Sequence, residues 1–374
     1  MTIPVLKPSI TDEEIQAVAD TMRSGWLGLG PKTAEFEDKF AQYVKAKFCV
    51  ALNSCTAALH LVMAALNLQP GDEVIVTPMT FISTVHSISY CGATPVFADI
   101  LPDTLNIDPN DVAKKIVPKT RAIIGVDIAG HPCDLDELMA IASENGLIFV
   151  EDAAHSCGAS YKDKPIGSIA PFTCFSFHAV KNLTCGEGGA ITAQDEWYQK
   201  WFNEMRWLGI SRDTWKRSET DKGYQWKYWV EELGFKYHMS DIAAAIGVVQ
   251  LKRLSQLNQI RQYIVSEYNR AFHDIDWLTL PQERSYVKSS WHLYQIKLPD
   301  ETSRDRMINH LLGEGITPGV HYLPAHLHPY YRQFKSICPV ASEIWRRILS
   351  LPIFPDLSHQ EQEKVIDAVR KFKP

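Results

Sequence analysis

A lysine followed by a glycine-rich turn is the most specific chemical signal in the sequence. Residues 175–189 read FSFHAVKNLTCGEGG, in which Lys181 follows Ser176 closely and the glycines come directly afterwards. A partly desolvated lysine amine has a lowered pKa and is nucleophilic near neutral pH, so Lys181 can form an imine with a cofactor aldehyde. Ser176 would then donate a hydrogen bond to a phosphate of that cofactor. Because an isolated lysine beside a glycine turn is usually only solvated, this interpretation depends on the neighbouring motifs.

An acidic residue at the end of a strand-like stretch is the second signal. The segment LIFVED (147–152) is apolar until its last two residues, and Ala153, Ala154 and His155 follow it. Open α/β sheets bind ligands outside the carboxyl ends of their strands. An acid there can pair with a protonated pyridine nitrogen and make the ring an electron sink. Side chains alternate along a strand, so Asp152 is the candidate and Glu151 points to the opposite face. An aspartate at a strand end serves about equally often as a turn or cap residue.

Two further motifs suit a phosphate and a flat ring. NSCTAA (53–58) forms a strand-to-helix junction, where free N–H groups and the positive helix end favour a phosphate. Taken alone, this motif is more simply explained by plain capping of the helix by Ser54 or Thr56. Phe81 follows the strand-like EVIVTP and could stack on a cofactor ring or belong to the core. Together the four motifs place a phosphate site, a ring-stacking face, an acid and a lysine at strand ends, and the combination is far more specific than any member.

The composition excludes several classes of protein. The chain has 374 residues, 45% hydrophobic and 22% charged, which is typical of a globular enzyme and long enough for two domains. A net charge of −6 without a basic stripe argues against sequence-independent nucleic-acid binding. The eight cysteines show no Cys-x-x-Cys spacing, so neither a zinc site nor a disulfide framework is expected. We find no signal-peptide pattern and no apolar run of the ~18 residues that a membrane span needs, so a cytoplasmic location is expected.

The first half of the chain alternates strand and helix patterns. A helix is predicted from about Asp12 with Thr11 as its cap. Short apolar runs then alternate with helical stretches, which predicts an α/β fold with a mostly parallel sheet covered on both faces. The predicted strands are 48–53, 73–78, 94–100, 122–128 and 147–152, and the predicted helices are 56–68, 80–91 and 134–146.

The pattern changes after about residue 195. The tryptophan-rich stretch 197–232 predicts a helix and a long loop, and a long helix follows from about Ser240 to residue 272. We therefore expect a large domain at 1–250 and a smaller α+β domain at 251–374, joined by the long helix. The predicted tail elements are a strand at 289–298, a helix at 303–315, a strand at 317–322 and two closing helical stretches.

These motifs together resemble the DegT/DnrJ/EryC1/StrS family of sugar aminotransferases, which are pyridoxal-phosphate (PLP) enzymes of fold type I. The resemblance covers nearly the whole chain, and the Lys181 segment and EDAAH (151–155) are its most specific parts. The supporting matches are 24–31, 53–61, 70–84, 91–100, 234–254, 289–298, 319–322 and 349–358.

The resemblance implies a role for each matching residue. Lys181 would hold the cofactor as an imine and move the proton between cofactor and substrate carbon. Asp152 would pair with the pyridine nitrogen, and His155 would lie near the ring hydroxyl. The remaining cofactor contacts would be ring stacking by Phe81 and phosphate binding by Cys55, Thr56 and Ser176.

The resemblance also implies a homodimer with shared active sites and glutamate as the cosubstrate. Lys236 and His238 would reach the partner's cofactor phosphate, although these positions often hold Asn and Arg in the family. Trp26, in the loop SGWLGLG, and His321 fall where the nucleotide-sugar binds. Asp127 stands where a histidine is common, which changes the expected substrate pocket.

Within the family the motifs look closest to transaminases that act on carbon 4 of UDP-linked 4-keto sugars, in the biosynthesis of cell-surface polysaccharides or glycoconjugates. Carbon 3, or a dTDP- or GDP-linked sugar, is the alternative, because the cofactor motifs do not encode the position. A PLP-dependent sugar 3-dehydratase has histidine in place of Lys181. A regulatory protein would need an added DNA-binding module, and a nicotinamide-dependent epimerase would need a G-x-G-x-x-G motif after the first strand.

Overall fold

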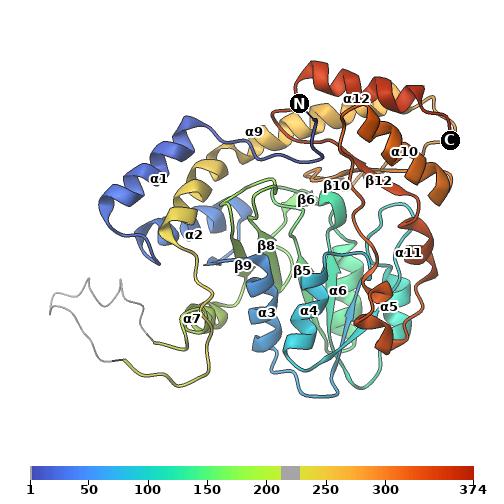
Figure 1. Cartoon of the computed structure of the whole chain (residues 1–374). Coiled ribbons are helices and arrows are strands. Elements are labelled where there is room, and N and C mark those ends of the chain that lie inside the picture. The colour runs from blue at the N-terminus through green and yellow to red at the C-terminus, as the bar shows by residue number, and fades with distance from the viewer. Residues whose placement is uncertain (1, 212–227) are drawn as a thin grey trace.

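A seven-stranded mixed sheet forms the centre of the computed structural model, which describes residues 2–211 and 228–374 (Figure 1). The strand order is β1-β9-β8-β5-β4-β2-β3. Neighbours from β8 to β3 are parallel, whereas β9 runs antiparallel to both β1 and β8. The predicted α/β class is therefore confirmed. The strands are β1 (Phe48–Leu52), β2 (Glu73–Val76), β3 (Thr94–Phe97), β4 (Thr120–Val126), β5 (Ile148–Asp152), β8 (Phe172–Ser176) and β9 (Gly189–Ala193).

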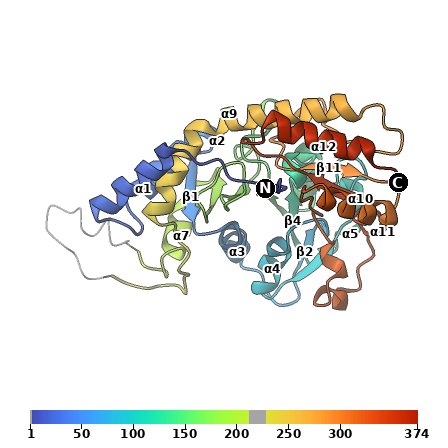
Figure 2. The ribbon, with the colours of Figure 1, turned by 45° about the horizontal axis from the view of Figure 1, so that its top comes forward.

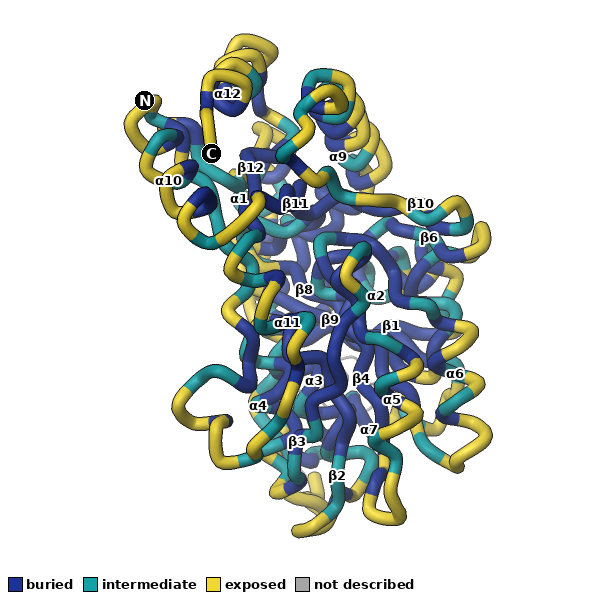
Figure 3. The backbone as a smooth tube through the Cα atoms, turned by 90° about the vertical axis from the view of Figure 1, so that its right-hand side faces the viewer, coloured by how far each residue is buried: buried dark blue, intermediate teal, exposed yellow. Residues whose placement is uncertain are grey.

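Helices cover both faces of the sheet because the strands carry apolar side chains on both faces. In β2, for example, Val74 and Val76 belong to one core and Ile75 to the other. This explains why the strands appear in the sequence as continuous apolar runs. One core includes α3 (Cys55–Ala65), α4 (Ile82–Tyr90) and α7 (Glu196–Met205). The other includes α2 (Pro31–Val44), α5 (Pro109–Lys115), α6 (Leu135–Glu144) and the start of α9 (Asp241–Phe272). Figure 3 shows the buried strands between the half-exposed helices.

The helix α9 links the sheet to the C-terminal part of the chain. Its first half packs on α2 and on α1 (Asp12–Ser24), and its second half enters a third apolar core (Figure 2). Ser240 begins the helix by accepting a hydrogen bond from the Ala243 N–H. The third core is completed by β11 (Tyr294–Lys297), α10 (Glu301–Gly313), β12 (Ile348–Leu351) and α12 (His359–Lys371). A domain boundary near residue 250 stays a prediction.

Between α10 and β12 the chain returns to the first core. Ala325, Tyr331 and Ala341 pack there, the last within α11 (Pro339–Ile344). A further small sheet joins β6 (Ser160–Tyr161), β7 (Lys164–Pro165) and β10 (Val287–Lys288). No helix within residues 2–211 and 228–374 is long and apolar enough to cross a membrane.

The structure differs from the sequence-based expectation in the C-terminal tail. The predicted strand 317–322 is wrong, because its backbone pairing is limited to two isolated contacts: Gly319 exchanges two hydrogen bonds with Ser350, and the Thr317 N–H donates to the Ile3 carbonyl. Pro318 has no N–H to donate to a ladder, which limits pairing at this point. The strand β12 was not predicted, and it pairs with β11 in antiparallel register. Of the stretch 197–232, residues 212–227 lie outside the described residues.

Candidate active site

A cavity of about 370 Å³ opens at the carboxyl ends of three neighbouring strands. Val126, Asp152 and Ser176 are the last residues of β4, β5 and β8, and all three line it. This is the edge where open α/β sheets bind ligands. Among the predicted site residues, the structure gathers Cys55, Thr56, Phe81, Asp152, His155, Ser176, Lys181 and His321 around this cavity.

Lys181 reaches the cavity from the loop that follows β8. The backbone N–H of Lys181 donates a 3.0 Å hydrogen bond to the His178 carbonyl, which tightens the turn. Burial lowers the pKa of the Lys181 amine to about 8, although the nearby Cys55 and Asp152 act in the opposite direction. About a tenth of such an amine is uncharged at pH 7, far more than for a lysine of ordinary pKa, so Lys181 can act as a nucleophile towards an aldehyde.

Asp152 is held in one orientation by three groups. The Thr84 hydroxyl donates to its Oδ2 over 2.7 Å, the Ala154 N–H donates to its Oδ1 over 3.1 Å, and the Cys55 thiol lies 3.9 Å from Oδ1. Burial raises the pKa of Asp152, while these hydrogen bonds and the Lys181 amine oppose that shift. A buried carboxylate oriented in this way can hold a proton on a ring nitrogen.

Glu151 lies on the opposite face of the sheet, as strand alternation predicts. It accepts a 2.8 Å hydrogen bond from Thr173, and burial together with the adjacent Asp127 raises its pKa. Asp127 accepts hydrogen bonds from Ser156 (2.6 Å) and from the Cys133 N–H (2.9 Å). Asp127 is fully buried and does not line the cavity, so it takes no direct part in the cavity wall.

The N-terminus of α3 suits an anion. Ser54 is its cap residue and accepts a 3.1 Å hydrogen bond from the Ala57 N–H, so the capping interpretation is correct for Ser54. The first N–H groups of a helix have no partner within the helix and point outwards, here beside the hydroxyls of Thr56 and Ser176. A Cβ on Gly189 would lie 2.4 Å from the Ser54 carbonyl carbon, so only glycine lets α3 begin this close to β9.

Neutral histidines form another wall of the cavity. The rings of His155 and His292 lie 4.4 Å apart, and burial and the Lys181 charge hold the pKa of both well below the usual range. The Ala129 N–H donates to Nδ1 of His155 over 3.3 Å, so the proton is on Nε2, 3.1 Å from the Tyr322 hydroxyl. His155 therefore donates to Tyr322, whose own proton can point to a ligand. Burial, followed by Lys181, lowers the pKa of His321 to about 4.

Several cavity residues were not predicted from the sequence. Thr84 lies about one helical turn beyond the predicted Phe81, and Tyr322 directly follows the predicted His321. Their positions next to predicted residues could therefore have identified both. Leu6 comes from a segment without a motif, and His292 lies in the family match 289–298, which gave no sign that its histidine reaches the cavity. They line the cavity through the fold of the N- and C-terminal segments.

Three predicted site residues do not line this cavity. Lys236 places its ammonium 3.3 Å from the centre of the Trp207 ring, and His238 packs against the same ring at 4.5 Å. Burial, with Lys236 and Arg206 adding to it, lowers the pKa of His238 to about 4. Trp26 donates through its indole N–H to the Leu29 carbonyl over 3.0 Å. Their predicted roles concern a substrate or a partner chain and stay predictions.

The donor set of the cavity fits PLP. It offers an amine of lowered pKa for an aldehyde, a buried carboxylate for a pyridine nitrogen, and helix N–H groups and hydroxyls for a phosphate. Phe81, which is 59% exposed, offers a ring face. Across the described part of the chain, no cluster of three or more acidic, histidine or cysteine side chains could hold a metal ion.

The fold matches that of solved aminotransferases, and the sequence comparison agrees. Residues 8–370 match the DegT/DnrJ/EryC1/StrS aminotransferase family. The chain belongs to this family and is an aminotransferase.

The relatives span the full length of the chain. The spore coat polysaccharide biosynthesis protein SpsC of Bacillus subtilis is 43% identical over 98% of this chain and 96% of its own. The PLP form of Spr1654 from Streptococcus pneumoniae, a proposed sugar aminotransferase, superposes with a TM-score of 0.92 at 34% identity over 100% of both chains. PseC of Helicobacter pylori, an aminotransferase involved in pseudaminic acid biosynthesis, gives a TM-score of 0.93 at 28% identity over 99% of both chains.

Proposed function

We propose that this enzyme uses PLP to transfer the amino group of glutamate to a nucleotide-linked keto sugar, specifically to carbon 4 of a UDP-4-keto sugar. The observation that carries the proposal is the cavity in which Lys181, with its pKa of about 8, lies across from the buried carboxylate of Asp152. The names of SpsC and PseC place related proteins in polysaccharide and amino-sugar biosynthesis, which supports a sugar as the acceptor and such a pathway as the context.

Each part of the cavity would bind one part of the cofactor. Thr56, Ser176 and the N-terminus of α3 would bind its phosphate, with Cys55 beside them. Phe81 would stack on the ring, and the neutral His155 would donate to the ring hydroxyl or to Tyr322. When bound, PLP supplies the aldehyde that accepts the amino group and a ring that withdraws electrons from the reacting carbon.

The chain's own groups would control the protons. Asp152 would keep the ring nitrogen protonated, because its carboxylate is buried and fixed by Thr84 and the Ala154 N–H. The amine of Lys181 would take the proton from the donor carbon and return it on the acceptor side. Because the pKa values of His155, His292 and His321 lie well below that of Lys181, these imidazoles are the weaker bases and compete little for that proton.

The acceptor would lie towards His321 and Tyr322, and the nucleotide towards Trp26. We propose that the enzyme is a homodimer in which Lys236 and His238 serve the cofactor phosphate of the other subunit. These two residues lie next to the end of β1, where His238 forms a β-bridge with Leu52, and their side chains pack on Trp207 without lining the cavity of their own chain. A cation contributed by the other subunit would add to the anion site at the start of α3.

The experiment is a two-stage reaction with the PLP-loaded enzyme. Glutamate alone should change the visible spectrum of the bound cofactor, and a suitable keto sugar should reverse that change. A panel of UDP-, dTDP- and GDP-linked 4-keto and 3-keto sugars, with product masses as the readout, identifies the acceptor. If a free keto acid restores the spectrum and no nucleotide keto sugar does, the sugar assignment is wrong and only the aminotransferase activity remains.

A further inference from the structure

The segment that precedes α1 crosses from the C-terminal core to α9, and we call residues 3–9 the N-terminal arm. Its first residues belong to the C-terminal core, where Ile3 is only 3% exposed. Ile3 exchanges hydrogen bonds with Gly315 (2.9 Å) and Thr317 (2.8 Å), and the Val5 carbonyl accepts from the Ile353 N–H over 3.0 Å. One end of the arm is therefore fixed to the small C-terminal core.

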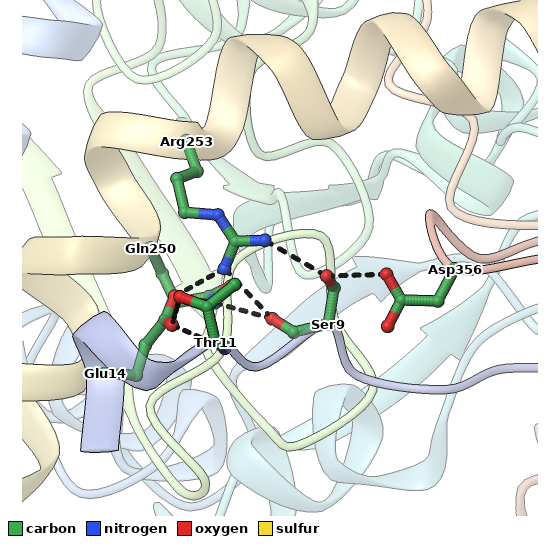
Figure 4. Close-up of polar contacts among 6 residues, drawn as sticks. All are labelled: Ser9, Thr11, Glu14, Gln250, Arg253 and Asp356. Atoms are coloured by element: carbon green, nitrogen blue, oxygen red, sulfur yellow. Dashed lines mark hydrogen bonds and ion pairs between the residues drawn. The ribbon is translucent and has the colours of Figure 1, made fainter.

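The other end of the arm is fixed at Ser9. Its hydroxyl donates to Asp356 over 2.8 Å and accepts from Arg253 over 3.1 Å, and its carbonyl accepts from the Gln250 side chain over 2.8 Å (Figure 4). Arg253 and Gln250 belong to α9, whereas Asp356 follows β12. Ser9 thus joins the arm to two segments that come from different parts of the chain.

A buried glutamate holds the α9 side of this contact together. Glu14 is 1% exposed, and its Oε1 accepts from Arg253 and from Gln250, each over 2.6 Å. Its Oε2 accepts from both the N–H and the hydroxyl of Thr11, which fixes the start of α1 (Figure 4). Since a buried carboxylate is costly unless its oxygens are paired, this network favours one position of the arm.

Leu6 lies between the two fixed ends. It lines the same cavity as Lys181 and Asp152 and packs its other side on the C-terminal core. Residues 6–10 form no helix or strand, so their contacts, and not regular backbone pairing, determine where Leu6 lies. An apolar side chain held on a fixed segment of the cavity wall restricts the size of what can enter.

We propose that the N-terminal arm is a wall of the active-site cavity, in which Leu6 determines how bulky an acceptor is admitted and Glu14 is a positioning residue that acts through Leu6. The class of acceptor rests on the proposed function. A keto sugar with a nucleotide is far larger than the keto acid formed from glutamate, so the size of the cavity matters more for the acceptor. Substitution of Leu6 should leave the reaction with the amino donor unchanged and should alter the reaction with the acceptor.

The test needs no knowledge of the sugar. The PLP-loaded enzyme is treated with hydroxylamine or with the bulkier O-benzylhydroxylamine, and the loss of visible absorbance of the lysine-bound cofactor is followed. Leu6→Ala should raise the rate of absorbance loss with the bulky reagent by roughly 10-fold, which is the effect that small apolar groups have on pocket selectivity. The rate with hydroxylamine should stay nearly unchanged. Ile10→Ala is the matched control, because Ile10 is 46% exposed and does not line the cavity.

The positioning role of Glu14 is tested by Glu14→Gln. Hydrogen exchange of residues 3–9 should become faster, the KM of the acceptor should rise, and the rate of the half-reaction with glutamate should stay the same. An unchanged ratio of the two reagent rates in Leu6→Ala, or an equal change in Ile10→Ala, overturns the proposal even if Glu14→Gln does not fold. Failure of every keto sugar as acceptor contradicts the proposed function instead and leaves the reagent ratio to decide the role of the arm.

Discussion

The hydroxyl of Thr84 donates a 2.7 Å hydrogen bond to Oδ2 of Asp152, linking the first turn of α4 to the end of β5. With the Ala154 N–H on Oδ1, it leaves the carboxylate little freedom to rotate. An acid that must hold a proton on a cofactor ring benefits from this restraint, because its orientation need not be found anew in each turnover.

Substitutions at these two positions should therefore give graded losses. Asp152→Asn keeps the shape and removes the charge, so activity should fall by at least ~100-fold, the low end of what positioned acid–base groups supply. Thr84→Val removes one hydrogen bond to a charged group, worth about 1.5–3 kcal/mol, and should cost about 10-fold to 100-fold. Ser83→Ala, which lines the same cavity without contacting Asp152 through a hydrogen bond in the described structure, is the control. Activity of Asp152→Asn within a few-fold of the parent would remove Asp152 from this role.

Covalent attachment of PLP should depend on Lys181. Borohydride reduction of the loaded enzyme should fix the cofactor to the peptide that contains Lys181, as seen by mass spectrometry of a proteolytic digest. Lys181→Ala should bind PLP without a reducible bond. Fixation of PLP to a different lysine in this variant would show that the assignment is incorrect.

The capture of PLP by the empty enzyme should accelerate as pH rises. Burial disfavours the charged ammonium of Lys181, so its pKa of about 8 is lower than that of a free lysine, and the nucleophile is the uncharged form. The rate should rise from pH 6.5 and level off above about pH 9, with its midpoint near 8. Stopped-flow absorbance at saturating PLP measures it. A midpoint above 10 would mean that the amine is not desolvated as described.

The shared active site can be tested by complementation. A Lys181→Ala chain and a chain carrying both Lys236→Ala and His238→Ala should each be nearly inactive. In a heterodimer, one site combines the intact lysine of one chain with the intact pair of the other, so up to half of the parental activity should return. Absence of recovery in a preparation that native mass spectrometry shows to contain heterodimers would contradict the proposal.

The local parts of this structure could be predicted, and the long-range parts could not. Continuous apolar runs such as those around Ile75 and Ile123 identified strands buried on both faces, and Lys181 and Asp152 stood at recognisable strand ends. Periodicity carries no information on which distant segments meet. Ser9 and Asp356 are separated by 347 positions, and no pattern in either segment marks the contact. The segment after Pro318 was misassigned for a related reason, since its single pairing with Ser350 is a tertiary contact.

The free energy of unfolding of the enzyme should depend on the charge of Glu14. Burial works to raise the pKa of Glu14, but hydrogen bonds from Thr11, Arg253 and Gln250 outweigh it, so the pKa in the folded state lies below the ordinary value of 4.5. A lowered pKa contributes stability at pH values above the unfolded pKa, and that contribution is lost as the pH falls through the folded pKa.

At neutral pH, Glu14→Gln should lower the free energy of unfolding by about 1.5–3 kcal/mol, the worth of a hydrogen bond to a charged group. The difference from the parent should be constant above about pH 5.5 and shrink below about 4.5, where the unfolded chain binds the proton first. It should be lost once the pH has fallen through the folded value and Glu14 is protonated in both states. Denaturant titrations from pH 7.5 to 3.5 measure it, with the exposed Glu13→Gln as the control. A difference that grows towards acid pH would mean that Glu14 is protonated in the folded enzyme and that the ion pair with Arg253 does not hold the N-terminal arm.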